Sequence, residues 1–250
     1  MLSLEGRTAI VTGSARNIGR ATALMLAREG AAIMVHGRAD RAGVDETVAL
    51  LRAAGARADG HLSDLSQEEG VASLVSATVN RLGPPDILIN NAAIRRNTPI
   101  TEMTFAEWRD VLGSSLDCAF LMTKACVPHM IAAKWGRIVN IGGISMFRGL
   151  AGRAHVSAAK AGMIGMSRSL ASELGPHGIT VNVVAPGAIA TERGAAAGAR
   201  PSATSSSAGV PVGRDGRPEE IAHIVTMLCK PDAAYTTGQT IEVNGGSHYS

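Results

Sequence analysis

A glycine-rich turn follows the first strongly apolar run of this chain. The run Thr8 to Val11 leads into TGSARNIG, residues 12–19, and the next stretch, ATALMLAREG, reads as a helix that ends at Gly30. Glycines at such a turn let the backbone approach a pyrophosphate, whose charge then meets the free N–H groups and the dipole of the helix N-terminus. The turn predicts a dinucleotide-binding site, and the alternative is a strand-to-helix turn without a ligand.

The elements that would position this turn are short apolar runs alternating with helix-like stretches. Such alternation requires crossover connections and predicts a parallel sheet covered on both faces. We expect a single-domain α/β fold over residues 1–250, a doubly wound, Rossmann-like parallel sheet with helices on both faces. The expected strands are Thr8 to Val11, Ala32 to His36, Ala58 to Leu62, Ile87 to Ile89, Ile138 to Ile141, Thr180 to Val184 and Thr240 to Val243.

One low-complexity segment interrupts this pattern. Residues 194–209 read GAAAGARPSATSSSAG and contain too few large apolar side chains to pack by themselves. We expect residues 190–215 to form a mobile substrate loop or lid.

Composition excludes several classes of protein. The chain has 250 residues, 46% apolar and 18% charged, with a formal net charge of +3 and no block of Lys and Arg, which argues against a nucleic-acid partner.

Glu5 and Arg7 interrupt any signal-peptide pattern, and no uninterrupted apolar run is long enough to span a bilayer, so we expect no membrane partner. Cys118, Cys126 and Cys229 have neither metal-ligand spacing nor an even count for disulfides. We expect buried thiols, no metal site and a cytoplasmic protein.

Several ordered motifs together resemble the short-chain dehydrogenase/reductase family. Residues 12–19 resemble its T-G-x-x-x-G-x-G turn with Asn17 for the middle glycine, and Asn90-Asn91-Ala92-Ala93 resembles its N-N-A-G strand end. Residues 182–191, NVVAPGAIAT, resemble the segment that lines the nicotinamide. Because Asn tolerates left-handed backbone better than other non-glycine residues, we expect the turn to survive at Asn17.

The resemblance implies a nicotinamide cofactor and a set of residues that bind it. The set spans the glycine-rich turn, the ends of the second, third and fourth strands, and the later proline–glycine turn. Its members are Gly13, Ser14, Arg16, Asn17, Ile18, Gly19, Arg38, Asp64, Leu65, Asn91, Ala92, Lys160, Pro186, Gly187, Ile189 and Thr191.

The choice of cofactor depends on charge at the end of the second strand. Family members selective for NAD usually place an Asp there, which repels a 2′-phosphate. This chain has His36-Gly37-Arg38 instead, and Arg16 lies in the glycine-rich turn. Two guanidinium groups bind a phosphate through charge-assisted hydrogen bonds, so we expect NADP(H) and disfavour NAD. The alternative is two surface arginines.

The catalytic part of the chain departs from the family pattern. Counting back from Lys160 in the family's Tyr-x-x-x-Lys motif places Val156 at the tyrosine, and the segment NIGG places Gly143 at the serine. Ser115 stands where the family has an asparagine that holds a water in its proton relay. The retained Lys160 would mainly anchor the ribose hydroxyls.

Two neighbouring side chains are candidates for the missing acid. His155 precedes the tyrosine position and could donate a proton near neutral pH, and Ser145 lies two residues past the serine position. If the helix already includes His155, however, a shift of one residue rotates the side chain by about 100° and aims it elsewhere. A helix-start histidine and a solvent-exposed loop serine are the alternatives.

Arginines also cluster around the expected site. Arg95 and Arg96 follow the NNAA strand end, and Arg148 and Arg153 lie between Gly143 and Val156. Because such sheets bind ligands at the carboxyl ends of their strands, these arginines are placed to hold an anionic small-molecule substrate. The alternative is a solvated basic rim.

Two features predict assembly. The expected helix Ser157 to Leu174 carries the small residues Ala158, Ala159, Ala161, Gly162 and Gly165, and Cys118 to Met130 forms a second apolar helix. In the resembled family these helices build the main interface, so we expect a homotetramer, with a dimer as the alternative.

The sequence leaves three functional classes open. The favoured one is an NADP-dependent oxidoreductase acting on a small carbonyl or alcohol compound, in which His155, Ser145 or a water replaces the tyrosine. The others are a cofactor-binding pseudoenzyme and a non-redox enzyme, because a fold does not fix its chemistry.

Overall fold

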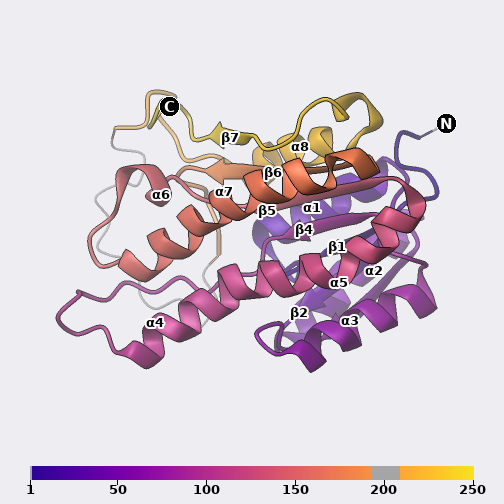
Figure 1. Cartoon of the computed structure of the whole chain (residues 1–250), viewed down its shortest axis with the longest axis horizontal. Helices are drawn as coiled ribbons and strands as arrows, with labels where there is room; N and C mark the ends of the chain where they lie inside the picture. Colours follow the sequence, from indigo (N-terminus) through magenta and orange to yellow (C-terminus); the bar gives the residue numbers. More distant parts are fainter. Residues whose placement is uncertain (1, 193–208) are drawn as a thin grey trace.

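Seven parallel strands form one sheet in the computed structural model of this chain, which describes residues 2–192 and 209–250. The strand order β3-β2-β1-β4-β5-β6-β7 reverses direction between β1 and β4, as in a doubly wound sheet. This confirms the expected Rossmann-like fold (Figure 1). The strands are β1 (Thr8–Val11), β2 (Ala32–Gly37), β3 (Ala58–Leu62), β4 (Ile87–Asn90), β5 (Gly136–Ile141), β6 (Ile179–Pro186) and β7 (Thr240–Val243).

Helices cover both faces of this sheet. One core cluster packs α1, α2 and α8 against one face, and a second packs α3, α5 and α7 against the other. The residues of β1, β2, β4, β5 and β6 are therefore buried along their whole length, which explains their continuous apolar runs. The helices are α1 (Asn17–Arg28), α2 (Arg41–Ala53), α3 (Glu68–Arg81), α4 (Phe105–Leu112), α5 (Cys118–Ala133), α6 (Ser145–Arg148), α7 (Ala154–Leu174) and α8 (Pro218–Cys229), with the shorter turns η1 (Gly113–Asp117), η2 (Gly175–His177) and η4 (Pro231–Ala233).

The elements α4, η1 and α5 form one continuous helix of 29 residues, Phe105–Ala133. By length and composition alone it could cross a membrane, although charged residues such as Asp117 and Lys124 interrupt its apolar sequence. A core helix of a soluble protein passes the same test, and here Met122, Cys126 and Met130 are buried against the sheet. The opposite side stays open, with the Phe120 side chain 51% exposed.

Helix α7 begins earlier than expected, at Ala154, and so includes both His155 and Val156. Only part of its small-residue stripe is open. Ala159 is buried inside the chain, and a Cβ on Gly162 would lie 2.8 Å from Leu116, so these two residues serve internal packing rather than a partner. The remaining small residues, Ala158, Ala161 and Gly165, lie exposed along one side of the helix.

The expected lid over residues 190–215 lies mostly outside the described part of the chain, which omits residues 193–208.

The three cysteines, Cys118, Cys126 and Cys229, are free and buried, as expected. Burial raises the pKa of each thiol to about 12, which makes all three unreactive near neutral pH.

Candidate active site

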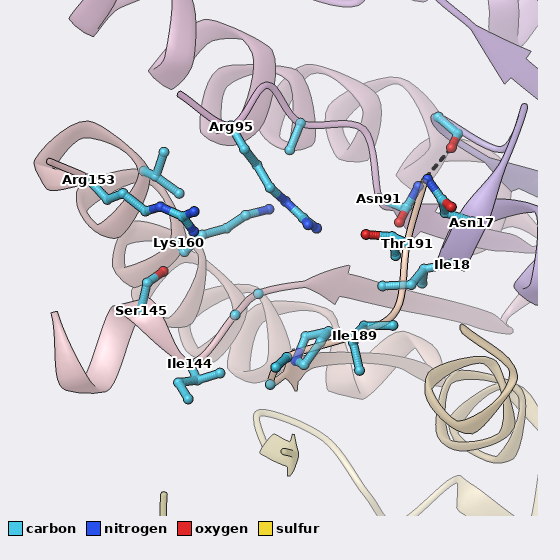
Figure 2. A pocket seen from close by; sticks show the side chains of 18 of the residues that line it. Asn17, Ile18, Asn91, Arg95, Ile144, Ser145, Arg153, Lys160, Ile189 and Thr191 are labelled. Carbon is cyan, nitrogen blue, oxygen red and sulfur yellow. Dashed lines mark hydrogen bonds between the residues drawn. The ribbon is translucent and has the colours of Figure 1, made fainter. Parts of the chain in front are cut away.

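A cavity of about 650 Å³ opens at the carboxyl edge of the sheet. The loops that follow β1, β4, β5 and β6 line it, together with the first turns of α1 and α7 (Figure 2). Ligands of doubly wound sheets bind at this edge, next to the point where the strand order reverses. The cavity contains most of the predicted cofactor residues: Gly13, Arg16, Asn17, Ile18, Gly19, Asn91, Ala92, Lys160, Pro186, Gly187, Ile189 and Thr191.

The glycine-rich turn keeps its backbone shape despite Asn17. Gly13 has φ +62° and Asn17 φ 52°, so both lie in the left-handed region, which confirms the expectation for Asn17. Position 19 requires a glycine, because the Cβ of any other residue would lie 2.7 Å from the Ser14 Cα. Within residues 2–192 and 209–250, no side chain caps the N-terminus of α1, and Ile18 and Gly19 of its first turn line the cavity, so their N–H groups are available to a ligand there.

Asn91 holds this turn against the end of β4. Its Nδ2 donates to the carbonyl oxygens of Thr12 and Gly13, each at 2.9 Å. The Thr12 hydroxyl in turn accepts from the backbone N–H groups of Asn91 and Ala92 at 2.9 and 3.0 Å. Asn91 therefore holds the glycine-rich turn in place at the cavity wall.

Asn17 also ties the turn to the segment after β6. Its Nδ2 donates to the Glu192 carbonyl at 2.8 Å, and its Oδ1 accepts from the Glu192 N–H at 2.9 Å (Figure 2 shows Asn17 beside Thr191). A glycine at position 17 would provide the same φ but not these two bonds. The departure from the family pattern thus adds a contact between two loops that line the cavity.

Four predicted cofactor residues lie outside the cavity lining: Ser14, Arg38, Asp64 and Leu65. The Ser14 hydroxyl donates to the Val11 carbonyl at 2.6 Å and accepts from the His36 N–H at 3.0 Å, so it joins β1 to β2. Leu65 is buried in the core. Arg38 and Asp64 form an ion pair at 2.7 Å beside the ends of β2 and β3.

Carboxylates accompany both predicted phosphate-binding arginines. Arg38 pairs with Asp64, and Arg16 pairs with Asp40. Burial opposes ionisation of Asp64, but hydrogen bonds from Ser66 and the Arg38 pair outweigh it and lower the pKa. The sequence interpretation found no acid at the end of β2 and missed Asp40, whose position as the N-cap of α2 was the available signal.

Lys160 and Val156 lie one helical turn apart on the face of α7 that meets the cavity. The Lys160 Nζ donates to the Ile141 carbonyl at 2.6 Å and lies 4.0 Å from the Met163 sulfur. Burial, followed by the positive charge of Arg95, lowers the pKa of Lys160 to about 7. The lysine is therefore an amine that changes charge near neutral pH inside the cavity.

The Ser145 hydroxyl lies close to where a side chain at position 143 would project. A Cβ built on Gly143 would be 3.9 Å from the Ser145 Oγ, and both residues line the cavity. Ser145 is buried and begins the short helix α6, in contrast to the solvent-exposed loop serine considered above.

Residues Ser247 and His248 contact α6, an interaction that no sequence pattern predicted. The Phe147 ring stacks on His248 with centroids 5.0 Å apart and an interplanar angle of 7°. Arg148 donates to the Ser247 carbonyl at 3.0 Å, and His248 pairs with Glu242 of β7 at 2.8 Å. Residues near the chain end thus fix the helix that carries Ser145.

The structure does not bring His155 or Ser115 into the cavity. The His155 side chain is fully buried, and its Nε2 lies 3.3 Å from the Glu107 Oε1 of α4. Its Nδ1 has no hydrogen-bond partner in the described part of the chain. Ser115 is buried in the π-helical turn η1, a kind of local distortion frequent at functional sites.

Comparisons with known proteins cover almost the whole chain. Residues 13–248 match the family model described as enoyl-(acyl carrier protein) reductase. The chain is 41% identical over 251 residues to the 3-oxoacyl-[acyl-carrier-protein] reductase FabG of Pseudomonas aeruginosa, with 100% of each chain covered. It is 38% identical over 251 residues to the protein of the same name from Escherichia coli, with 99% of each chain covered.

A solved structure agrees with these similarities. The crystal structure of a dehydrogenase/reductase from Sinorhizobium meliloti superimposes with a TM-score of 0.91 at 32% sequence identity. The match covers 99% of this chain and 97% of the other.

Proposed function

Because this chain belongs to the short-chain dehydrogenase/reductase family of oxidoreductases, we propose that it transfers hydride between NADP(H) and a small carbonyl or alcohol compound, with a proton donor other than tyrosine. One observation carries the proposal. The uncapped N-terminus of α1 and the amine of Lys160 open onto the same cavity.

The residues present fit a dinucleotide. The left-handed Gly13 and Asn17, the close packing at Gly19 and the free N–H groups of α1 make a cradle for a pyrophosphate. Lys160 and the Pro186-Gly187 turn line the same cavity, and they are the residues proposed to hold the nicotinamide riboside. NADPH, when bound, supplies the hydride.

Cavity residues rather than His155 are the proposed source of the proton. In this proposal the Ser145 hydroxyl donates a hydrogen bond to the carbonyl oxygen of the substrate. Its Oγ lies 3.9 Å from where a Cβ at position 143 would project, close to the position of the family's serine. The Lys160 ammonium provides the proton, directly or through a water, because its pKa of about 7 suits an acid working near neutral pH. His155 has its imidazole against Glu107 and takes no part.

The preference for NADP(H) rests on Arg16 and Arg38. Each guanidinium is held beside the end of β2 by a carboxylate, Asp40 or Asp64, and retains donors for a phosphate. These carboxylates reduce the local positive charge, so we propose a moderate preference over NAD.

We also propose a cytoplasmic homotetramer without nucleic-acid or membrane partners. Support comes from the exposed stripe of Ala158, Ala161 and Gly165 on α7 and from the open apolar side of α5 at Phe120. An interface between copies would cover this side of Phe105–Ala133. Sedimentation equilibrium at micromolar concentration tests this, and a monomer would contradict it.

The function is tested by following NADPH oxidation with short 3-oxoacyl thioesters and simple ketones as substrates. The names of the relatives contain the 3-oxoacyl group, so this carbonyl class is the first to assay. Since an ammonium donor must be protonated, turnover should be constant below pH about 7 and fall above it, by about tenfold per pH unit. Tight NADPH binding without turnover on any carbonyl would refute the oxidoreductase.

A further inference from the structure

The cavity wall carries a strong excess of positive charge. Among the described residues that line it, the single acidic side chain is Glu192. The cationic ones are Arg16, Arg95, Arg96, Arg148, Arg153 and Lys160.

Three of these arginines have partners that hold them at the wall. Arg16 pairs with Asp40, Arg96 pairs with Asp110 at 2.7 Å, and Arg148 donates to the Ser247 carbonyl. Arg95 and Arg153 also make contacts within the protein, so the choice among the five arginines rests on where their guanidinium groups point.

Arg95 and Arg153 differ in where they point. Arg95 comes from the loop after β4, and Arg153 is the N-cap residue of α7. In Figure 2 both guanidinium groups extend into the cavity toward the Lys160 amine, one from each side. The positive charge of Arg95 also lowers the pKa of Lys160, after burial, which agrees with the two groups facing the same space.

Three cationic groups facing one half-enclosed space favour an anion strongly. Each guanidinium offers paired N–H donors in a planar fork that fits a carboxylate or a phosphate. Beside them, Ile144, Leu150 and Val156 provide apolar wall for a short carbon chain. The lining thus offers separate places for an anion and for an aliphatic segment.

We propose that Arg95 and Arg153 bind an anionic group of the substrate, a carboxylate or a phosphate monoester that is distinct from the carbonyl being reduced. The role of this group as part of a substrate rests on the function proposed above. The anion site itself rests only on the two arginines and the cavity.

Steady-state kinetics with matched compounds tests the proposal. The compounds are acetoacetate, its methyl ester and hydroxyacetone phosphate. Acetoacetate carries a carboxylate, the ester is neutral at the same position, and hydroxyacetone phosphate carries a phosphate monoester. We expect at least one anion to exceed the ester in kcat/KM by about tenfold or more, since charge-assisted pairs of this kind are strong. The double variant Arg95→Gln/Arg153→Gln should raise KM for that anion and leave KM for the ester unchanged. Arg109→Gln, an exposed change on α4, is the matched control.

Binding measured without turnover separates this proposal from the oxidoreductase. Calorimetry with malonate and with inorganic phosphate should give heat that the double variant abolishes and added salt weakens. If this binding occurs but no carbonyl is reduced, the oxidoreductase fails and the anion site stands. Equal kcat/KM for acid and ester, or a double variant that loses NADPH affinity and no anion affinity, would overturn the anion site.

Discussion

The two ends of the cavity differ in what their chemistry depends on. At the glycine-rich turn, the working groups are backbone N–H donors, set by the left-handed Gly13 and Asn17 and by close packing at Gly19. At the α6 and α7 wall, the working groups are side chains, and there Val156 and Gly143 provide none.

This difference explains why one end tolerates substitution and the other changes its chemistry. Asn17 replaces a glycine, yet the backbone keeps the required φ and gains two hydrogen bonds to Glu192. A valine one turn before Lys160 also fits the fold, since it is buried at the cavity wall. On the function proposed above, however, it provides no proton donor and leaves Lys160 as a buried amine.

Restoring the family's hydroxyls at the α7 wall should have the largest effect. Val156→Tyr with Gly143→Ser should raise the turnover of a simple ketone by up to about a hundredfold, because a positioned acid contributes about a hundred to ten thousand fold and the proposed Lys160 donor already supplies part of this. Steady-state NADPH oxidation measures this. The matched control Val156→Phe with Gly143→Ser adds the ring without its hydroxyl, and an equal gain from it would contradict the explanation.

Filling the glycine-rich turn should damage cofactor binding instead of proton transfer. In Gly19→Ala the new Cβ would lie 2.7 Å from the Ser14 Cα, and such overpacking costs about 1 to 3 kcal/mol, so NADPH affinity should fall by roughly 5- to 150-fold. Fluorescence titration measures the dissociation constant. Gly175→Ala, where a Cβ meets nothing within 4 Å, is the matched control and should bind NADPH normally.

Charge at the end of β2 should have a smaller effect. Arg38→Ala should reduce the preference for NADPH over NADH by about tenfold. A charge-assisted hydrogen bond to the 2′-phosphate is worth about 1.5 to 3 kcal/mol, and the ion pair between Arg38 and Asp64 reduces this contribution. Arg41→Ala is the control, because Arg41 is exposed and pairs with Asp45 at 3.5 Å. Arg38→Asp should reverse the preference. An unchanged ratio of the two affinities would remove Arg38 from cofactor selection.

His155→Ala should have the smallest effect on catalysis, although it disturbs the fold. The imidazole is fully buried against Glu107, whose pKa is lowered first by the Thr98 hydroxyl and then by His155. Removing a large buried side chain costs roughly 2 to 5 kcal/mol, so thermal unfolding should occur at lower temperature. The pH profile of turnover should keep its shape, and loss of a limb near neutrality would restore His155 as the acid.

Much of the fold could be predicted because its signals are local. Short runs of three to five mostly apolar residues marked all seven strands, with ends one or two residues short in β2, β4, β5 and β6. The glycine-rich turn and the tolerance of Asn17 for positive φ are also local properties of the backbone. The helix expected over Ser157 to Leu174 was also marked locally, although α7 begins three residues earlier, at Ala154, and so takes in Val156 as well as Lys160.

Packing between distant elements decided the rest. His155 and Val156 are adjacent in sequence, but α7 turns one toward Glu107 of α4 and the other toward the cavity. Sequence alone did not show that Asp40 pairs with Arg16, or that His248 stacks on Phe147 of α6. The backbone conformation that a residue prefers, and the spacing of apolar residues around it, can be read from a few neighbouring positions in the sequence. Its partner, and therefore its charge state and role, depends on which other element the tertiary fold brings beside it.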